Sequence, residues 1–244
     1  MEQLKKTSAA AAQQALDFKL DEGSYFSSLI PGSNAPAISL LRDALQRGQN
    51  ELFYIFGPRG CGKSHLLTAL FRDVQRPSPE IFFIDLKAAK KLSPELLNIE
   101  VPPVLLLDNV DAPAGDSQWE LALFALFNRW VDRHSGTFIA SASCSADRIP
   151  FAMHDLNTRF ENGVSLPLQP LNDQECEQAL ILKAHLRGIK MSPKVAAFLV
   201  RHLNRDMHRL TAVLNLLDHE TLRQQHMLTV QFVKKILAQS AYEV

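Results

Sequence analysis

The chain has 244 residues and a mass of 27.3 kDa, which suits one large domain or a medium domain with a small companion. Lys and Arg together number 26, as do Asp and Glu, so the formal net charge is zero and a strongly basic nucleic-acid clamp is excluded. A hydrophobic share of 46% and a charged share of 21% are typical of a folded globular protein and exclude a disordered one.

Nothing in the sequence indicates a membrane span or a secretion signal. No apolar run reaches the ~18 residues that a span needs, and the N-terminus has no apolar signal segment. Cys61, Cys144 and Cys176 lie far apart without CxxC spacing, so we expect neither a disulfide nor a zinc site. The eight histidines never recur three or four residues apart, which argues against a metal site on a helix. These patterns predict a cytoplasmic protein.

The first 23 residues differ from the rest of the chain. They are rich in Ala, Gln and charge without a lasting apolar period, so they predict a mobile tail. From Leu52 the pattern changes to apolar runs of strand length that alternate with segments of helical period. The predicted strands cover 52–56, 81–86, 104–107, 137–142 and 164–168. Because strands that are apolar throughout are typical of a sheet covered on both faces, the sequence predicts an α/β core with a five-stranded parallel sheet.

Helical patterns occur in two places. Within the core they cover 63–76 and 116–133. Beyond residue 170 the strands stop and four helices are predicted in succession. Their signals are a start at Asn172 with Glu175 and a stop at Gly188, a start at Ser192-Pro193, a helix from Asp206 to about Gln224, and a start at Thr229 with an end near Ala238. We therefore expect a tail over 1–23, an α/β core over 24–170 and a small all-α, four-helix domain over 171–244.

A complete phosphate-binding motif follows the first predicted strand. The pattern G-x-x-x-x-G-K-[ST] is formed by Gly57, Pro58, Arg59, Gly60, Cys61, Gly62, Lys63 and Ser64. Its glycines let backbone N–H groups point at phosphate oxygens, and the following helix adds its positive end. Lys63 would bridge the outer phosphates, and the Ser64 hydroxyl would bind Mg²⁺.

The third predicted strand ends in a carboxylate, as in the Walker B motif. Asp108 follows four apolar residues and can reach a Mg²⁺ ion held by Ser64. The next residue is Asn109, and an amide can hydrogen-bond water but cannot take its proton. Asp111 is an uncertain substitute for the missing acid. The sequence therefore predicts strong nucleotide binding with feeble hydrolysis of its own.

Three more polar groups suit a site that senses the phosphates of a bound nucleotide. The fourth predicted strand ends at Ser141 to Ser143, and we expect Ser143 to lie beside Asp108 as a sensor of phosphate or water. Arg159 precedes the fifth strand, where we expect a loop. Arg205 is expected to begin a helix, where a cation opposes the helix dipole and needs a partner that Asp206 could supply.

Together these residues resemble the AAA+ ATPases, which combine such a core with a helical lid. Residues 25–34 are similar to the segment that leads into the DnaA-type core and packs on the nucleotide base. The resemblance implies that Phe26, Ile30 and His65 also line the nucleotide site. It further implies that Arg159, in Asn157-Thr158-Arg159-Phe160, is an arginine finger acting in trans, and that Arg205 faces the phosphates from the lid.

Within this superfamily, the chain is similar to the Hda family of DnaA-related regulators. The resemblance covers about residues 24–239 and includes no counterpart of the helix-turn-helix domain that follows the lid in DnaA. That family carries a sliding-clamp-binding peptide, Q-L-x-L-x-L, near its N-terminus. In residues 13–18, QQALDF, Gln13 supplies the rim amide and Leu16 and Phe18 the apolar anchors, but Gln14 stands where Leu is usual.

The resemblance implies a negative regulator of replication initiation. It implies a bound ADP or ATP, with ADP as the working form, and Mg²⁺ held by Ser64 and Asp108. The partners implied are the sliding clamp, DNA only through that clamp, a second copy of this chain, and DnaA, whose bound ATP is hydrolysed with the help of Arg159.

Two other functions remain open at this stage. A helicase-loader or transposition-helper ATPase would share the P-loop and lid, but it should bind single-stranded DNA, and the neutral charge counts against that. A small-molecule kinase would need an acceptor pocket and would leave Arg205, the helical domain and the tail without a role.

Overall fold

Five parallel strands form one sheet in the order β2-β3-β4-β1-β5. The computed structural model describes residues 24–74, 81–224 and 228–239, so the predicted tail and its clamp-binding peptide lie outside the described residues. The strands are Leu52–Phe56 (β1), Ile81–Asp85 (β2), Val104–Asp108 (β3), Thr137–Ala142 (β4) and Val164–Pro167 (β5). The predicted five-stranded parallel sheet is confirmed.

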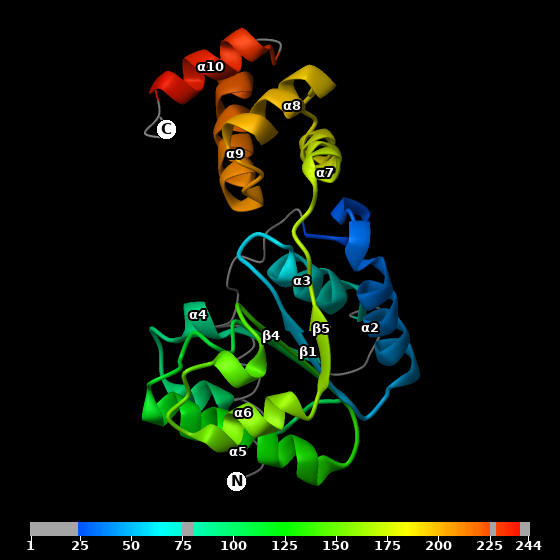
Figure 1. Ribbon diagram of the computed structural model, residues 1–244, viewed down its shortest axis with the longest axis vertical. Helices are drawn as coiled ribbons and strands as arrows, with labels where there is room; N and C mark the ends of the chain where they lie inside the picture. Colours follow the sequence, from blue (N-terminus) through cyan, green and yellow to red (C-terminus); the bar gives the residue numbers. More distant parts are fainter. Residues whose placement is uncertain (1–23, 75–80, 225–227, 240–244) are drawn as a thin grey trace, which may run out of the picture. The chain divides into compact units, whose positions relative to one another are not determined.

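Helices cover both faces of this sheet, because successive side chains of each strand point to opposite sides. On one face Leu105, Phe138 and their neighbours pack against α5 (Ser117–Arg133) and α6 (His154–Glu161). On the other face lies α3 (Lys63–Val74), whose Phe71 contacts Phe83 of β2 with ring centroids 5.6 Å apart. Figure 1 shows α2 (Ala35–Arg47) beside α3 on that second face.

Short elements complete this part of the chain. They are the 3₁₀ helices η1 (Phe26–Ser28), η2 (Gly32–Asn34), η3 (Pro94–Leu97) and η4 (Ala146–Arg148), and the short helix α4 (Leu86–Ala89). Asn34 ties the start of the core to its end, because its side-chain amide both donates to the Gln169 carbonyl at 2.9 Å and accepts from the Gln169 N–H at 2.8 Å.

The C-terminal part of the chain is all-α, as predicted. Its helices are α7 (Asp173–Leu186), α8 (Pro193–His202), α9 (Met207–Gln224) and α10 (Val230–Gln239), which follow one another in the yellow-to-red part of Figure 1. The predicted capping box is present at α7, where Asn172 and Glu175 exchange hydrogen bonds of 3.0 and 2.8 Å. Apolar side chains of all four helices form a separate core.

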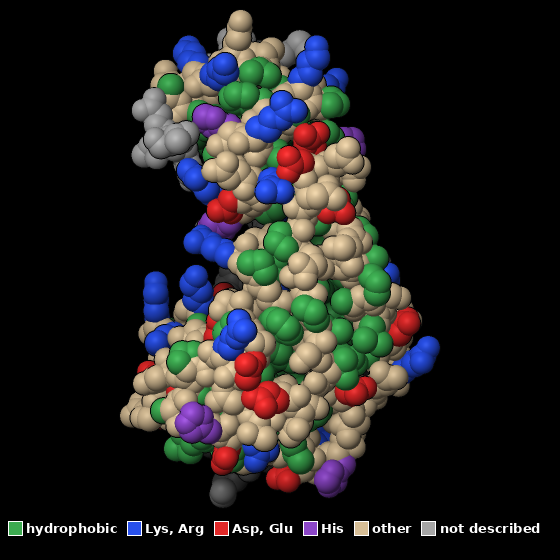
Figure 2. Space-filling model, viewed as in Figure 1, with side chains coloured by type: hydrophobic (Ala, Val, Ile, Leu, Met, Phe, Trp, Pro, Cys, Tyr) green, Lys and Arg blue, Asp and Glu red, His purple; other side chains and the backbone are tan. Residues whose placement is uncertain are grey.

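The chain divides into two compact units. The first holds residues 34–58 and 62–169 with the end of the N-terminal segment, and the second holds 27–33, 59–61 and the residues from Pro170 onward. On the face that Figure 2 shows, Lys and Arg are interspersed with Asp and Glu on each unit. Across the described ranges, no helix has both the length and the apolar character that crossing a membrane requires.

Candidate functional site

The phosphate-binding motif lies where β1 ends and α3 begins. Gly60 and Gly62 have φ values of 83° and 97°, a left-handed backbone that favours glycine and lets the loop curl. Lys63 is the first residue of α3 and is only 8% exposed. Its ammonium donates to the Gly57 and Pro58 carbonyls at 2.7 and 3.0 Å, so the charge lies inside the curve of the loop. A helix N-terminus and a cation thus face the same point, which suits a phosphate.

Asp108, the last residue of β3, is buried with an exposed fraction of 2%. The hydroxyls of Ser141 on β4 and of Ser64 in α3 donate to its carboxylate. Burial raises the pKa of Asp108, and these two hydrogen bonds work against that rise. Of the two nearest charges, Asp85 raises this pKa further and Lys63 lowers it. The parallel strands therefore bring the predicted Ser64 and Asp108 together although 44 positions separate them in the sequence.

A serine hydroxyl next to a carboxylate fits Mg²⁺, which binds oxygen ligands and usually keeps phosphate and water in its shell. Within the described ranges, no three side chains of His, Cys, Asp or Glu gather as a closed metal site would require. The oxygen atoms of Ser64 and Asp108 are of the kind that would suit a Mg²⁺ ion held jointly by protein and nucleotide.

Asn109 follows Asp108 in a left-handed backbone conformation, with φ of 56°, which Asn tolerates better than most residues. Its side-chain amide donates to Asp85 Oδ1 at 2.8 Å, while its backbone N–H donates to Asp108 Oδ1 and to Ser141 Oγ at 3.1 and 3.2 Å. The contact with Asp85 is absent from the sequence prediction, because Asp85 ends a different strand, 24 positions earlier.

The two serines near the end of β4 have different partners. Ser141 is fully buried within β4 and donates to Asp108. Ser143, the predicted sensor, lies beyond the strand, is exposed, and donates through its hydroxyl and its N–H to Asp111 Oδ2. The structure thus pairs Asp111 with Ser143, and Asp108 with Ser141, the other serine at the predicted strand end. Strand register could have indicated Ser141, since Leu106 and Leu107 of β3 lie opposite Ile139 and Ala140 of β4.

The expectation that Arg159 lies in a loop is wrong. Arg159 lies in α6, because residues 154–161 pack Leu156, Asn157 and Phe160 against the core at helical spacing. Its half-buried guanidinium lies over the rings of Phe124 and Phe127 of α5, at 4.4 and 5.2 Å from their centroids. Among the residues that the structure describes, none forms a hydrogen bond or a salt bridge with this guanidinium.

The expected place of Arg205 at a helix start is also wrong. α9 begins at Met207, and Asp206 caps it by accepting from the N–H groups of His208 and Arg209 at 2.9 and 3.2 Å. Arg205 precedes the helix with φ of 60°, and its partner is Asp173 of α7, at 3.3 Å, rather than Asp206. Both side chains are more than half exposed, so this ion pair contributes little to stability.

The remaining predicted nucleotide contacts lie in or near the N-terminal segment. Phe26 lies in η1, with the Arg42 guanidinium 4.6 Å from its ring centroid. His65 of α3 forms a hydrogen bond of 3.2 Å with the Tyr25 carbonyl, so the motif helix holds this segment. Ile30 lies between η1 and η2 and is half-buried. Arg59, Gly60 and Cys61 complete the loop, and Cys61 is buried.

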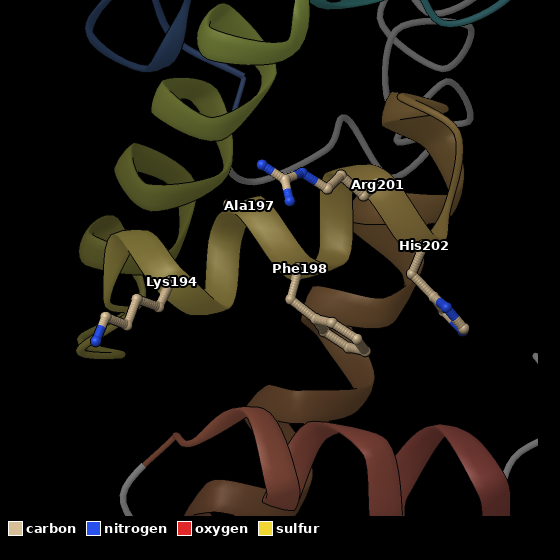
Figure 3. Close-up of a pocket in the computed structure, with 5 residues that line it drawn as sticks. All are labelled: Lys194, Ala197, Phe198, Arg201 and His202. Carbon is tan, nitrogen blue, oxygen red and sulfur yellow. The ribbon is translucent and has the colours of Figure 1, made fainter.

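A hollow of about 560 Å³ lies on α8 in the helical unit. It is lined by Lys194, Ala197, Phe198, Arg201 and His202 (Figure 3). The rings of Phe198 and His202 stack with centroids 5.4 Å apart, and Lys234 Nζ lies 5.5 Å from the Phe198 centroid. None of these residues was predicted to act.

Residues 173–237 match the family model described as the Hda lid domain. The fold is similar to that of domain III of the replication initiation protein DnaA from Thermotoga maritima, with a TM-score of 0.76 at 18% identity over 90% of this chain and 97% of that one. It is also similar to AMPPCP-bound DnaA from Aquifex aeolicus, with a TM-score of 0.65 at 18% identity over 86% and 70% of the two chains. The RuvB Holliday junction branch migration motor of Thermotoga maritima gives 0.67 at 15% identity over 91% and 73%. The α/β core with its helical domain is therefore an AAA+ core with a lid.

Proposed function

Because the chain is an Hda/DnaA-like AAA+ protein, we propose that it regulates DNA replication initiation by acting on DnaA. The observation that carries the proposal is the Hda lid-domain match over residues 173–237 in a chain whose core keeps a complete phosphate-binding motif. The proposed action is negative: the protein promotes hydrolysis of the ATP that DnaA holds and so prevents renewed initiation.

In this proposal the protein holds an adenine nucleotide, with ADP as the working form. The Aquifex DnaA of similar fold holds AMPPCP. Lys63 would contact the phosphates, Ser64 and Asp108 would hold Mg²⁺, and Phe26, Ile30 and His65 would lie at the base. The bound metal would supply positive charge against the phosphate oxygens. Arg205 of the lid would contact the phosphates. This contact requires that the exposed ion pair between Arg205 and Asp173 break.

The proposed catalytic contribution to DnaA comes from Arg159. Its guanidinium is held by aromatic rings of α5 and has no ionic partner among the described residues, which supports presentation to another subunit. An arginine supplied across an interface stabilises charge on the transferring phosphoryl group and contributes about 10³–10⁵ to the rate. The same interface would allow the protein to associate with itself.

The test is ATP hydrolysis by DnaA, measured with and without this protein on DNA that carries the sliding clamp. We expect stimulation that requires the clamp and is reduced about 10³-fold by Arg159→Ala. Arg47→Ala, which removes an exposed arginine at the end of α2, is the matched control and should leave stimulation unchanged. An absence of stimulation with nucleotide still bound would contradict the proposal and favour a helicase-loader or transposition-helper ATPase.

The clamp contact is proposed to lie in the N-terminal segment, outside the described residues. Gln13 would hydrogen-bond the pocket rim, and Leu16 and Phe18 would fill the pocket. We expect Gln13→Ala combined with Leu16→Ala to abolish clamp binding in a surface-immobilised assay while nucleotide affinity stays constant. Clamp binding equal to that of the unmodified protein would exclude this peptide.

A further inference from the structure

The two faces of α8 differ in what they contact. One face enters the core of the lid through apolar side chains, which are Val195, Ala196, Leu199 and Val200. The other face lines the hollow of about 560 Å³, and three of its five lining residues are Lys, Arg or His. Because the lid core is packed through the first face, the positive charge on the second face is not needed to fold this unit.

The rings of Phe198 and His202 form a flat surface, the aromatic shelf, on the face of α8 that lines the hollow. Their planes are inclined by 17° and their centroids lie 5.4 Å apart. Figure 3 shows both side chains extending from α8 on the side of α10. Phe198 is half-buried and packs against the lid core, so its ring is held in place. Such a ring is suited to stack with a nucleic-acid base, because every base has a π face.

Three cations lie beside the aromatic shelf. Lys234 comes from α10, and its Nζ lies 5.5 Å from the centroid of Phe198. Lys194 precedes Phe198 by four positions on α8 and Arg201 follows it by three, so both lie about one turn from the ring. All three cations are exposed, and within the described ranges none forms a salt bridge and no Asp or Glu lines the hollow. This surface therefore attracts anions.

The positive charge of this surface is local. Over the whole chain, 26 Lys and Arg residues balance 26 Asp and Glu residues. The packing of α10 against α8 in the lid core brings Lys234 to a ring that lines the same hollow as Lys194. A neutral net charge excludes a nucleic-acid clamp that is basic throughout. It is compatible with a compact group of cations beside an aromatic ring, which is the arrangement that binding of a single strand uses.

We propose that the hollow on α8 binds single-stranded nucleic acid. A base stacks on the aromatic shelf, and Lys194, Arg201 and Lys234 contact the neighbouring phosphates. A duplex fits less well, because its bases are paired and stacked on one another and do not reach the shelf. An acidic peptide would use the cations but leave the shelf without a planar partner. This inference goes beyond the proposed function, which requires DNA only as the support of the sliding clamp.

Fluorescence anisotropy of a short labelled oligodeoxythymidine, titrated with the full chain at several salt concentrations, tests the site. Phe198→Leu keeps an apolar side chain of similar size but removes the flat ring. We expect it to weaken binding about fivefold or more, because stacking is lost, and to leave the salt dependence unchanged. Lys234→Ala removes a phosphate contact, so it should weaken binding and lower the slope of log affinity against log salt by about 0.7.

Two further variants are the matched controls. Lys190→Ala removes an exposed lysine of the same unit that is not among the described residues lining the hollow, and it should leave both the affinity and the salt slope unchanged. Phe198→Tyr keeps an aromatic ring at the shelf and should bind the oligomer as tightly as the unmodified protein. Because Phe198 also packs against the lid core, the melting temperature of each variant is measured, and Phe198→Tyr separates loss of the ring from loss of folding.

Three outcomes would overturn the proposal. The first is an absence of binding by the unmodified protein, or equal binding by Phe198→Leu. The second is equal affinity for the oligomer and for a duplex of the same length, which would mean that bases do not stack on the shelf. The third is displacement of the oligomer by poly-glutamate at equal charge, which would assign the surface to acidic peptides. None of these assays contains DnaA, so their result is independent of the proposed function.

Discussion

The segments that follow β1 and β3 differ in how many of the side chains expected at an ATP-hydrolysing site they carry. After β1 the motif is complete, with two left-handed glycines, a buried lysine inside the loop and a serine that reaches Asp108. After β3 the carboxylate that we propose for Mg²⁺ is present, but the next side chain is an amide that donates to Asp85 of β2, the strand farther from the loop. One strand end carries a complete phosphate-binding motif, and the other carries an amide at the position where hydrolysis would need a proton acceptor.

This difference teaches that binding and hydrolysis depend on separate residues within one sheet. Binding needs backbone N–H groups, a helix N-terminus and one cation, all of which belong to a single continuous segment. Hydrolysis also needs a proton acceptor held at one place relative to the phosphates, which depends on how adjacent strands are paired. A chain can therefore keep the first and lose the second with a single side-chain change.

The largest effect should come from removing the cation at the end of β1. We expect Lys63→Ala to weaken ATP and ADP binding about 10–100-fold, since a hydrogen bond to a charged group contributes about 1.5–3 kcal/mol. Titration calorimetry measures this affinity. Lys87→Ala, which removes an exposed lysine of α4, is the control, and equal affinity losses in both variants would contradict a phosphate role for Lys63.

Ser141→Ala tests whether β4 supports the carboxylate at the end of β3. It removes one of the hydrogen bonds to the buried Asp108, to which Ser64 and the Asn109 N–H also donate. Because a hydrogen bond to a charged group contributes about 1.5–3 kcal/mol, the free energy of unfolding should fall by about that amount. Urea denaturation measures this loss. Ser165→Ala removes an exposed hydroxyl from β5 and should change stability by less than about 0.5 kcal/mol. Equal losses in the two variants would mean that the bond to Asp108 is dispensable.

Asp108→Asn should stabilise the protein without nucleotide at neutral pH, because burial penalises the ionised carboxylate and an amide carries no charge. Burial raises the pKa of Asp108 in the folded state above its unfolded pKa of about 3.9. At a pH between these two pKa values, the folded state binds more protons than the unfolded state. Stability of the unmodified protein therefore falls as pH rises through that window, and the full cost remains above the folded pKa.

The Asp108→Asn variant carries a neutral amide and escapes this cost, so its advantage should shrink as the pH falls toward about 3.9. Melting temperatures across a pH series measure it, at about 2–4 °C for each 1 kcal/mol. A variant less stable than the unmodified protein at neutral pH would contradict the expected penalty.

The smallest effect should come from Asp111, the other acid after β3. Because its carboxylate accepts from Ser143, we expect Asp111→Asn to change the intrinsic rate of ATP hydrolysis less than about twofold. The rate of ATP hydrolysis by Asp111→Asn and by the unmodified protein, measured under single-turnover conditions, checks this prediction. A tenfold loss would make Asp111 the missing proton acceptor and remove the contrast between the two strand ends.

Much of the fold could be predicted because its signals are local. Apolar runs of five or six residues identify strands, and helical spacing identifies α3, α5 and the four lid helices. The Asn172–Glu175 capping box spans only three positions, and the structure contains it as predicted. The local signal is weak where a segment carries few apolar residues: α6 reads as a loop in the sequence, since only Leu156 and Phe160 of its eight residues are buried apolar side chains.

The sequence by itself determined the phosphate-binding motif, because loop, lysine and helix start are contiguous and their chemistry depends on adjacent backbone groups. Only the tertiary structure decided what each distant side chain contacts: Ser141 rather than Ser143 at Asp108, Asp85 at Asn109, aromatic rings under Arg159, and Asp173 at Arg205. The physical reason is that strand order, strand register and helix packing bring together residues that are far apart in the chain, and these arise from burial of the whole core rather than from any local pattern.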